Sequence, residues 1–128
     1  MFAKLSAYIQ GANALGIQIN STVPAIVKVT NGAPNNFEMS FFLDISGIPP
    51  APIPGSDVFL TLRPANDVFV RDFPGLSTAS VVSQEANTLT SQLSALSLQF
   101  NPMYFHVALY NPPFPASNIY NEIWVAKI

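Results

Sequence analysis

Prolines divide this sequence into short segments, and their placement limits the folds that the chain can adopt. The chain has twelve prolines, which fall between the apolar runs rather than inside them. Proline cannot donate to the hydrogen-bond ladder of a sheet, so it is found in turns, at sheet edges and at strand ends. Short apolar segments separated by such residues are typical of β-strands joined by turns.

Within these segments, apolar and polar residues alternate with the period of two expected of a half-buried strand. The clearest example is Phe37–Ile45, where every second residue is apolar and Glu38, Ser40 and Asp44 take the other face. The same pattern predicts six further strands, at Gly16–Asn20, Val23–Thr30, Asp57–Arg63, Asp67–Asp72, Tyr104–Tyr110 and Ile119–Ile128. A mostly β domain follows from this spacing.

Turn residues suggest how some of these strands pair. The tripeptide Pro64-Ala65-Asn66 predicts a hairpin between Asp57–Arg63 and Asp67–Asp72. The segment Asn111-Pro112-Pro113 and Pro115 would join the last two strands into a second hairpin. Val23–Thr30 ends at Asn31-Gly32, which is a strong turn signal.

One stretch has helical rather than strand periodicity. Apolar residues recur at intervals of three and four from Val82 to Phe100. Ser83 is a candidate N-cap, and Glu85 would lie in the first turn. We therefore expect one short helix near residues 83–97, while Met1–Gln10 fits either a strand or a short helix.

Seven or eight short strands at regular spacing predict an antiparallel β-sandwich or jelly roll with one short helix, built as a single domain over residues 1–128. The closing segment resembles the last hairpin of fibronectin type III domains, through Tyr104–Asn111 and Ile123–Val125. That resemblance implies a sandwich and carries no functional meaning.

Low charge is the most unusual property of the composition. Charged residues make up 9% of the chain, against about 25% in ordinary soluble domains. The five basic residues are scattered, so the sequence offers no stripe that could follow a nucleic-acid backbone. No apolar run approaches the ~20 residues of a membrane span, and residues 5–19 make a poor signal-peptide core.

The residues needed for common catalytic and metal sites are largely missing. The chain has no cysteine and one histidine, His106, which is expected in mid-strand at a surface or interface. The seven carboxylates are dispersed, and no glycine-rich phosphate loop or nucleophile turn is found. We therefore predict no enzyme, no catalytic residues, no metal site and no cofactor.

Aromatic residues occupy several strand positions that a sandwich would turn outward. Such a cluster on a weakly charged surface is typical of a partner site. The predicted interface residues are Phe42, Phe59, Phe69, Tyr104, Tyr110 and Trp124.

These features favour a non-catalytic structural subunit, with a capsid, decoration or tail component of a virion as the preferred hypothesis. Its partners would be copies of itself or other coat proteins, and its location the virion or, alternatively, the cytoplasm or the extracellular space. The alternative is a carbohydrate- or protein-binding module in which Trp124, Tyr104 and Tyr110 stack on a ligand.

Overall fold

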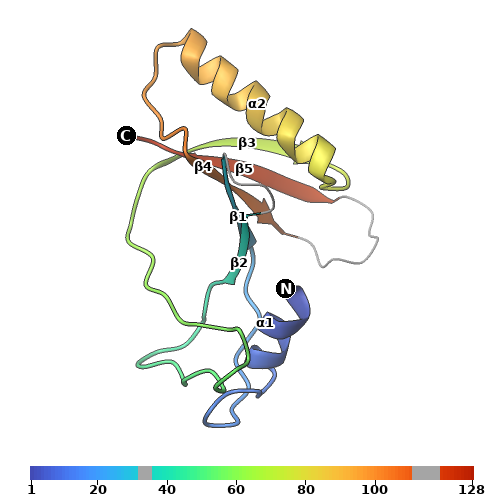
Figure 1. Ribbon diagram of the computed structural model, residues 1–128, viewed down its shortest axis with the longest axis vertical. Helices are drawn as coiled ribbons and strands as arrows, with labels where there is room; N and C mark the ends of the chain where they lie inside the picture. The colour runs from blue at the N-terminus through green and yellow to red at the C-terminus, as the bar shows by residue number, and fades with distance from the viewer. Residues whose placement is uncertain (32–35, 111–118) are drawn as a thin grey trace.

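The chain folds into one antiparallel sheet with a long helix on one face and a short helix beyond one end (Figure 1). The computed structural model describes residues 1–31, 36–110 and 119–128. The elements, in chain order, are α1 (Phe2–Ile9), β1 (Ala25–Thr30), β2 (Phe37–Phe41), β3 (Val68–Pro74), α2 (Ala79–Ala95), β4 (Tyr104–Leu109) and β5 (Tyr120–Ala126). The five strands lie in the order β2-β1-β4-β5-β3, and all neighbours are antiparallel.

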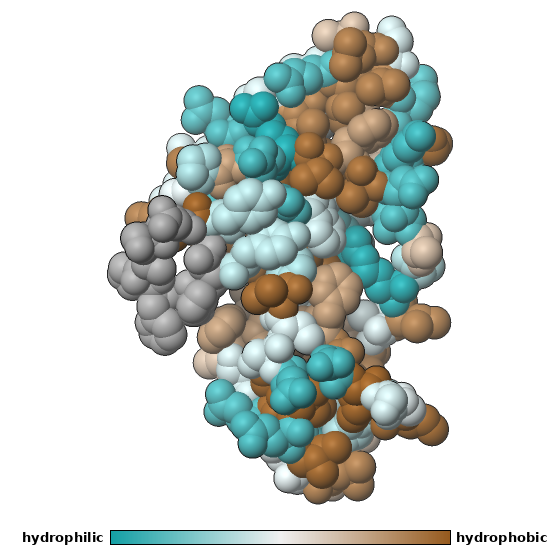
Figure 2. All heavy atoms as spheres, turned by 180° about the vertical axis from the view of Figure 1, so that it is seen from behind, coloured by the Kyte–Doolittle hydropathy of each residue, from teal (hydrophilic) through white to brown (hydrophobic). Residues whose placement is uncertain are grey.

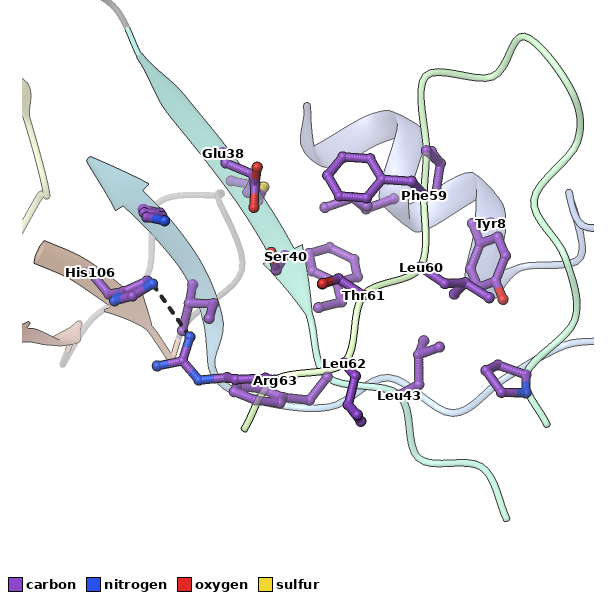
Figure 3. A pocket seen from close by; sticks show the side chains of 18 of the residues that line it. Tyr8, Glu38, Ser40, Leu43, Phe59, Leu60, Thr61, Leu62, Arg63 and His106 are labelled. Atoms are coloured by element: carbon purple, nitrogen blue, oxygen red, sulfur yellow. Dashed lines mark hydrogen bonds between the residues drawn. The ribbon is translucent and has the colours of Figure 1, made fainter. Parts of the chain in front are cut away.

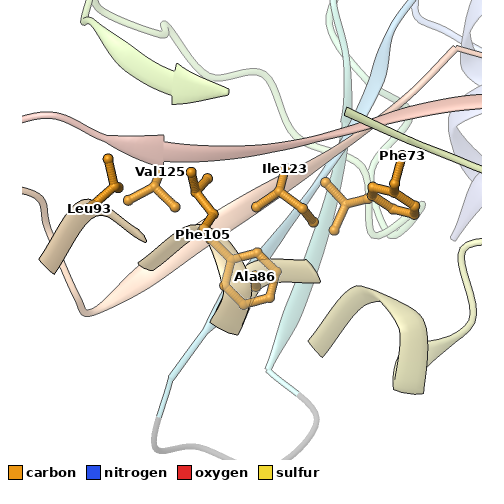
Figure 4. Close-up of a cluster of buried hydrophobic side chains, with 8 residues drawn as sticks. Phe73, Ala86, Leu93, Phe105, Ile123 and Val125 are labelled. Carbon is orange, nitrogen blue, oxygen red and sulfur yellow. The ribbon is translucent and has the colours of Figure 1, made fainter. Parts of the chain in front are cut away.

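The main hydrophobic core lies between α2 and the sheet (Figure 4). Alternation along the strands directs Phe73, Phe105 and Ile123 to this face, and Ile123 is fully buried. The helix contributes residues at intervals of three and four, which are Ala86, Leu89 and Leu93. Because this face is filled by α2, the opposite face of the sheet remains for other segments.

A second, smaller core forms around α1. Tyr8 and Ile9 pack against Ile19 and against residues just beyond the end of β2, including Leu43 and Ile45. A polar side chain, Asn13, stabilises the turn after α1 by donating to the carbonyl oxygens of Tyr8 and Ile17 at 2.9 and 2.8 Å. Long irregular segments, rather than a second sheet, surround this core in Figure 1.

Several sequence predictions are confirmed. The last two predicted strands pair antiparallel as β4 and β5, and Val23–Thr30 contains β1. The predicted helix is present as α2, although it begins four residues earlier, at Ala79 rather than residue 83. Met1–Gln10 contains the helix α1. The predicted turn residues Gly32 and 111–115 lie outside the described residues.

Other strand predictions are wrong. Asp57–Arg63 forms no strand: it pairs with none of the five strands of the sheet, and Asp57 itself takes a positive φ of 60°, outside the extended region. Its supposed hairpin partner is β3, which pairs instead with β5. Gly16–Asn20 forms no strand and contributes an isolated bridge between Asn20 and Asp44. Gly16 itself takes a φ of 63°, outside the extended region.

The predicted strand Phe37–Ile45 stops at Phe41, because Leu43 and Ile45 leave the sheet to pack around α1. The described part of the chain therefore contains five strands in place of the predicted seven or eight. The predicted mostly antiparallel β-fold is confirmed, and the described residues contain two helices: α2, which was predicted, and α1, in a segment that fitted either a strand or a short helix. Within residues 1–31, 36–110 and 119–128, the strands form one sheet, without the second sheet of a sandwich or jelly roll.

The N-cap of α2 provides a first test of local stability. The Thr78 side chain accepts a hydrogen bond from the Val81 backbone N–H at 3.3 Å, whereas the predicted cap Ser83 lies inside the helix. We expect Thr78→Ala to lower the free energy of unfolding by ~1 kcal/mol, with Ser83→Ala as the matched control. Urea denaturation of both variants measures the difference, and equal losses would contradict the assignment of the cap.

Candidate functional site

The face of the sheet turned away from α2 forms one wall of a cavity of about 1000 Å³ (Figure 3). Residues 57–66, which run from the α1 region back to β3, form the opposite wall, and α1 contributes Tyr8 and Ile9. In Figure 3, Glu38 and Ser40 of β2 lie across the cavity from Phe59, Leu60 and Thr61. The cavity thus lies where the sheet, α1 and this irregular segment meet.

A row of directly paired residues crosses the sheet at this wall. Glu38 of β2 lies opposite Lys28 of β1, Lys28 opposite His106 of β4, and His106 opposite Trp124 of β5. Side chains paired across antiparallel strands lie on the same face. The register therefore brings a carboxylate, an ammonium, an imidazole and an indole onto one face of the sheet, and all four residues line the cavity.

His106 is buried, with 8% of its surface exposed, so the prediction of a surface or interface position is corrected. Its Nε2 lies 3.3 Å from Nη1 of Arg63. A guanidinium can only donate, so Nε2 accepts this hydrogen bond and the ring proton lies on Nδ1. Burial, followed by the charges of Arg63 and Lys28, lowers the pKa of His106 to about 4. The imidazole is therefore neutral near pH 7.

Two positive charges at this cavity lack an ionic partner. In the described part of the chain, the ion pairs are Lys4–Asp57 and Arg71–Glu85. Arg63 and Lys28 instead lie over aromatic rings, with the guanidinium carbon 5.9 Å from the centre of the Trp124 ring and Lys28 Nζ 4.6 Å from that of Tyr104. Such contacts stabilise a cation without neutralising it. An anionic ligand would therefore find two available cations here.

The segment formed by residues 57–66 supplies most of the apolar surface on the other wall. Phe59 and Leu62 are 63% and 93% exposed, and both line the cavity. The segment is attached to α1 through an ion pair of 2.7 Å between Lys4 and Asp57, which lowers the pKa of the Asp57 carboxyl. Large apolar side chains left exposed beside a cavity indicate a surface that a ligand can cover.

Exposed apolar surface is not confined to this segment. Figure 2 shows brown surface over the lower part of the molecule, where α1 and the irregular segments lie, and again over the upper part. The exposed large apolar side chains include Ile48, Leu15 and Leu96. On this face, apolar patches therefore lie between polar areas.

Four of the six aromatics predicted to form an interface line the cavity. These are Phe42, Phe59, Tyr104 and Trp124. Phe69 lies on the α2 face, partly buried against the main core, so its outward placement is corrected. A role for these residues in contacts with another chain remains a prediction.

Tyr110 belongs to a hydrogen-bonded group beside the cavity. Its hydroxyl and the Trp124 indole N–H both donate to Oε1 of Glu122, at 2.9 and 2.8 Å, and Tyr120 donates to Oε2. Burial alone would raise the pKa of Glu122, but these three hydrogen bonds together lower it. The group fixes the orientation of the Trp124 ring at the edge of the cavity.

A conventional metal site is not found. The described residues contain no group of three His, Cys, Asp or Glu side chains that could hold a metal ion. No helix in the same residues is long and apolar enough to cross a membrane.

Sequence patterns alone do not indicate that Arg63, Lys28 and His106 lie together at the centre of the site. Arg63 was assigned to a strand that does not exist, and Lys28 was treated as one of several scattered charges. A usable signal was present in β1 and β4, where Lys28 and His106 each interrupt an otherwise apolar strand. Only the register shows that these two interruptions lie side by side.

The family model and the two similar proteins that follow are all described as heme-binding. The family model described as "SOUL heme-binding protein" matches residues 1–126. "Heme-binding protein 2" of Mus musculus is 33% identical over 131 residues, which covers 98% of this chain and 64% of that protein. "Heme-binding protein 2" of Homo sapiens is 33% identical over 132 residues, with the same coverage. The chain therefore spans less than two thirds of the length of these relatives.

These matches overturn the hypothesis of a virion subunit. The family description and both relatives name heme as a ligand, and none names a capsid, a decoration protein or a carbohydrate. Low charge and surface aromatics suggested a coat protein because both features also occur at contacts between subunits. Here, four of the six aromatics surround a cavity instead.

Proposed function

The chain belongs to the SOUL heme-binding protein family, and on this premise we propose that it binds heme in the cavity between the sheet and residues 57–66. The observation that carries the proposal is the combination of a neutral imidazole and two unpaired cations in a cavity with largely apolar walls. Heme combines the same three chemical features, since it has a flat apolar ring, an iron that takes axial ligands and two carboxylates.

The cavity is large enough for such a ligand. Its volume of about 1000 Å³ lies at the upper end of the ~300–1000 Å³ range of small-molecule sites. Phe59 and Leu60 on the irregular segment, with Phe41 and Ile9 on the opposite side, provide apolar contacts for the ring. Covering Phe59, which is 63% exposed, would remove apolar surface from water and favour binding.

Arg63 and Lys28 are cations that could pair with the two carboxylates of heme. Arg63 and Lys28 lie on opposite walls of the cavity, and both contact aromatic rings instead of acidic side chains. Charge-assisted hydrogen bonds between guanidinium or ammonium and carboxylate are about twice as strong as neutral ones. We therefore assign these two residues to the heme carboxylates.

The proposal concerns binding and includes no reaction. The family description names a bound ligand, and the cavity presents one histidine without an adjacent orienting carboxylate among its described hydrogen bonds. No cofactor was predicted from the sequence, because recognition of heme needs only one or two side chains at the iron, whereas a metal site built from the protein alone needs a cluster of ligands.

A heme titration tests the proposed function. We expect a saturable change in the visible absorbance of added hemin, together with quenching of Trp124, the only tryptophan in the chain. Arg63→Gln or Lys28→Gln should each weaken binding about tenfold, equivalent to ~1.4 kcal/mol, because each removes a partner of a carboxylate.

The matched control is Lys127→Gln, which removes an exposed positive charge that does not line the cavity. It should leave the affinity unchanged. An equal loss in all three variants would show non-specific attraction of an anionic ligand, and the absence of saturation with the wild-type chain would contradict heme binding itself.

A further inference from the structure

We infer that His106 Nε2 is the protein ligand of the heme iron, and that Arg63, whose Nη1 lies 3.3 Å from this nitrogen, transfers to a heme carboxylate. This inference rests on the proposed function and extends it to a single coordinating atom. His106 lies in the middle of the cavity wall formed by the sheet, between Lys28 and Trp124. It is also the only imidazole in the chain.

The direction of the Nε2 lone pair supports this role. In Figure 3, the imidazole points toward Arg63, and the hydrogen bond runs from the guanidinium to Nε2. Since Nε2 accepts, it carries no proton, and its lone pair is directed toward the segment that forms the other wall. Neutral imidazole nitrogen is the form that coordinates iron. The atom is therefore in the correct protonation state before heme arrives.

The contact between Arg63 and His106 is one that a heme could exchange. Arg63 pairs with a neutral acceptor at 3.3 Å, and a carboxylate is a stronger acceptor for a guanidinium. Its side chain belongs to residues 57–66, which form no strand or helix. Binding would thus free Nε2 for iron and give Arg63 the anionic partner that it lacks in the described structure.

Other potential ligands at the cavity are less suitable. The Tyr8 hydroxyl donates to the Pro50 carbonyl oxygen at 2.6 Å, and burial raises its pKa, which disfavours the phenolate that binds iron. Tyr104, whose ring centre lies 4.6 Å from Lys28 Nζ, and Met39 also line the cavity, and tyrosine and methionine are both donor types known in heme proteins. Tyr104→Phe and Met39→Leu are therefore suitable controls for the histidine variant.

The single histidine allows a test on the unaltered chain. Tag-free protein labelled with ¹⁵N-histidine contains one labelled residue, His106. Electron-nuclear double resonance of its ferric heme complex should show strong coupling between iron and ¹⁵N. A complex that shows saturable heme absorbance without such coupling would overturn the inference while leaving heme binding intact. A chain that binds no heme would overturn both.

Variants distinguish coordination from a structural role. We expect His106→Ala to lose the spectrum of histidine-ligated heme and to bind about tenfold more weakly, with added imidazole restoring the spectrum. Metal-free protoporphyrin should bind wild type and His106→Ala equally, because it has no iron to coordinate. Equal loss of heme and protoporphyrin binding in His106→Ala would indicate a structural effect and contradict the inference. An unchanged heme spectrum in His106→Ala, together with a changed spectrum in Met39→Leu, would also contradict it.

Discussion

Lowering the pH of the ligand-free protein from 7 to 4 is expected to reduce its free energy of unfolding by up to ~3 kcal/mol through His106 alone. The folded chain holds the pKa of this imidazole at about 4, below the ordinary value of 6.5. The unfolded chain therefore takes up the proton first, at higher pH. The stabilisation is complete well above pH 6.5, is lost as the pH falls from 6.5 toward 4, and levels off below about pH 4, where the folded imidazole is itself protonated.

The groups around His106 explain why protonation is costly. Arg63 from the irregular segment and Lys28 from β1 are both cationic, and burial removes the water that would solvate a third charge. Tyr104 packs edge-on against the imidazole at 5.4 Å between ring centres. The carboxylate on this row, Glu38, lies beyond Lys28 in the register.

Urea denaturation at a series of pH values measures the effect, and His106→Gln is the control. This variant should lose the dependence between pH 6.5 and 5, whatever its absolute stability. The carboxyls of Asp57 and Glu122 have lowered pKa values, so their stabilising contributions disappear only at lower pH, as they become protonated. A wild-type stability that is constant between pH 6.5 and 5 would contradict the neutral, buried state of His106.

Replacing Phe73 with alanine is expected to cost about 3–5 kcal/mol of unfolding free energy. Phe73 is 3% exposed and packs in the core between the sheet and α2. Its removal leaves a cavity that the β3–β5 ladder and the helix cannot easily close. The loss of stability therefore includes the free energy gained by burying the phenyl ring and the van der Waals contacts that its neighbours no longer make. For a small domain, this amount is a large part of the total stability.

Phe37→Ala is the matched control, since it deletes the same side chain from the edge strand β2, where Phe37 is 47% exposed. The expected cost is about 1 kcal/mol or less. Urea denaturation of both variants, with an unchanged dependence on denaturant concentration, gives the comparison. Similar costs in the two variants would show that α2 does not enclose Phe73 in solution.

Local sequence patterns predicted the parts of this fold that depend on periodicity. Alternation identified β1, β2, β4 and most of β3, and spacing of three and four identified α2, because both periods arise from one buried face. The segment Asp57–Arg63 shows the limit of this reasoning. Val58, Leu60 and Leu62 also alternate, but this segment lines a cavity and pairs with no strand of the sheet.

The site was less predictable because it depends on register. Four of the aromatics named from the sequence do surround the cavity, since they were chosen as residues outside the core. The sequence shows Lys28 and Arg63 only as two of five scattered basic residues, and His106 only as a single histidine within a strand. Their proximity depends on the pairing of β1 with β4 and on the return of the irregular segment across the sheet.

The two separate cores described above have a thermodynamic consequence. One core joins α2 to the sheet, the other surrounds α1, and the cavity is lined by residues from both parts of the molecule. A ligand that fills the cavity would contact the sheet and the α1 region. Opening either region would then also require loss of the ligand, so binding would raise the free energy of opening for both. Without ligand, the α1 region can open at lower cost than the sheet, and amide hydrogen exchange would report two levels of protection. With ligand bound, the two regions would be expected to exchange as one cooperative unit.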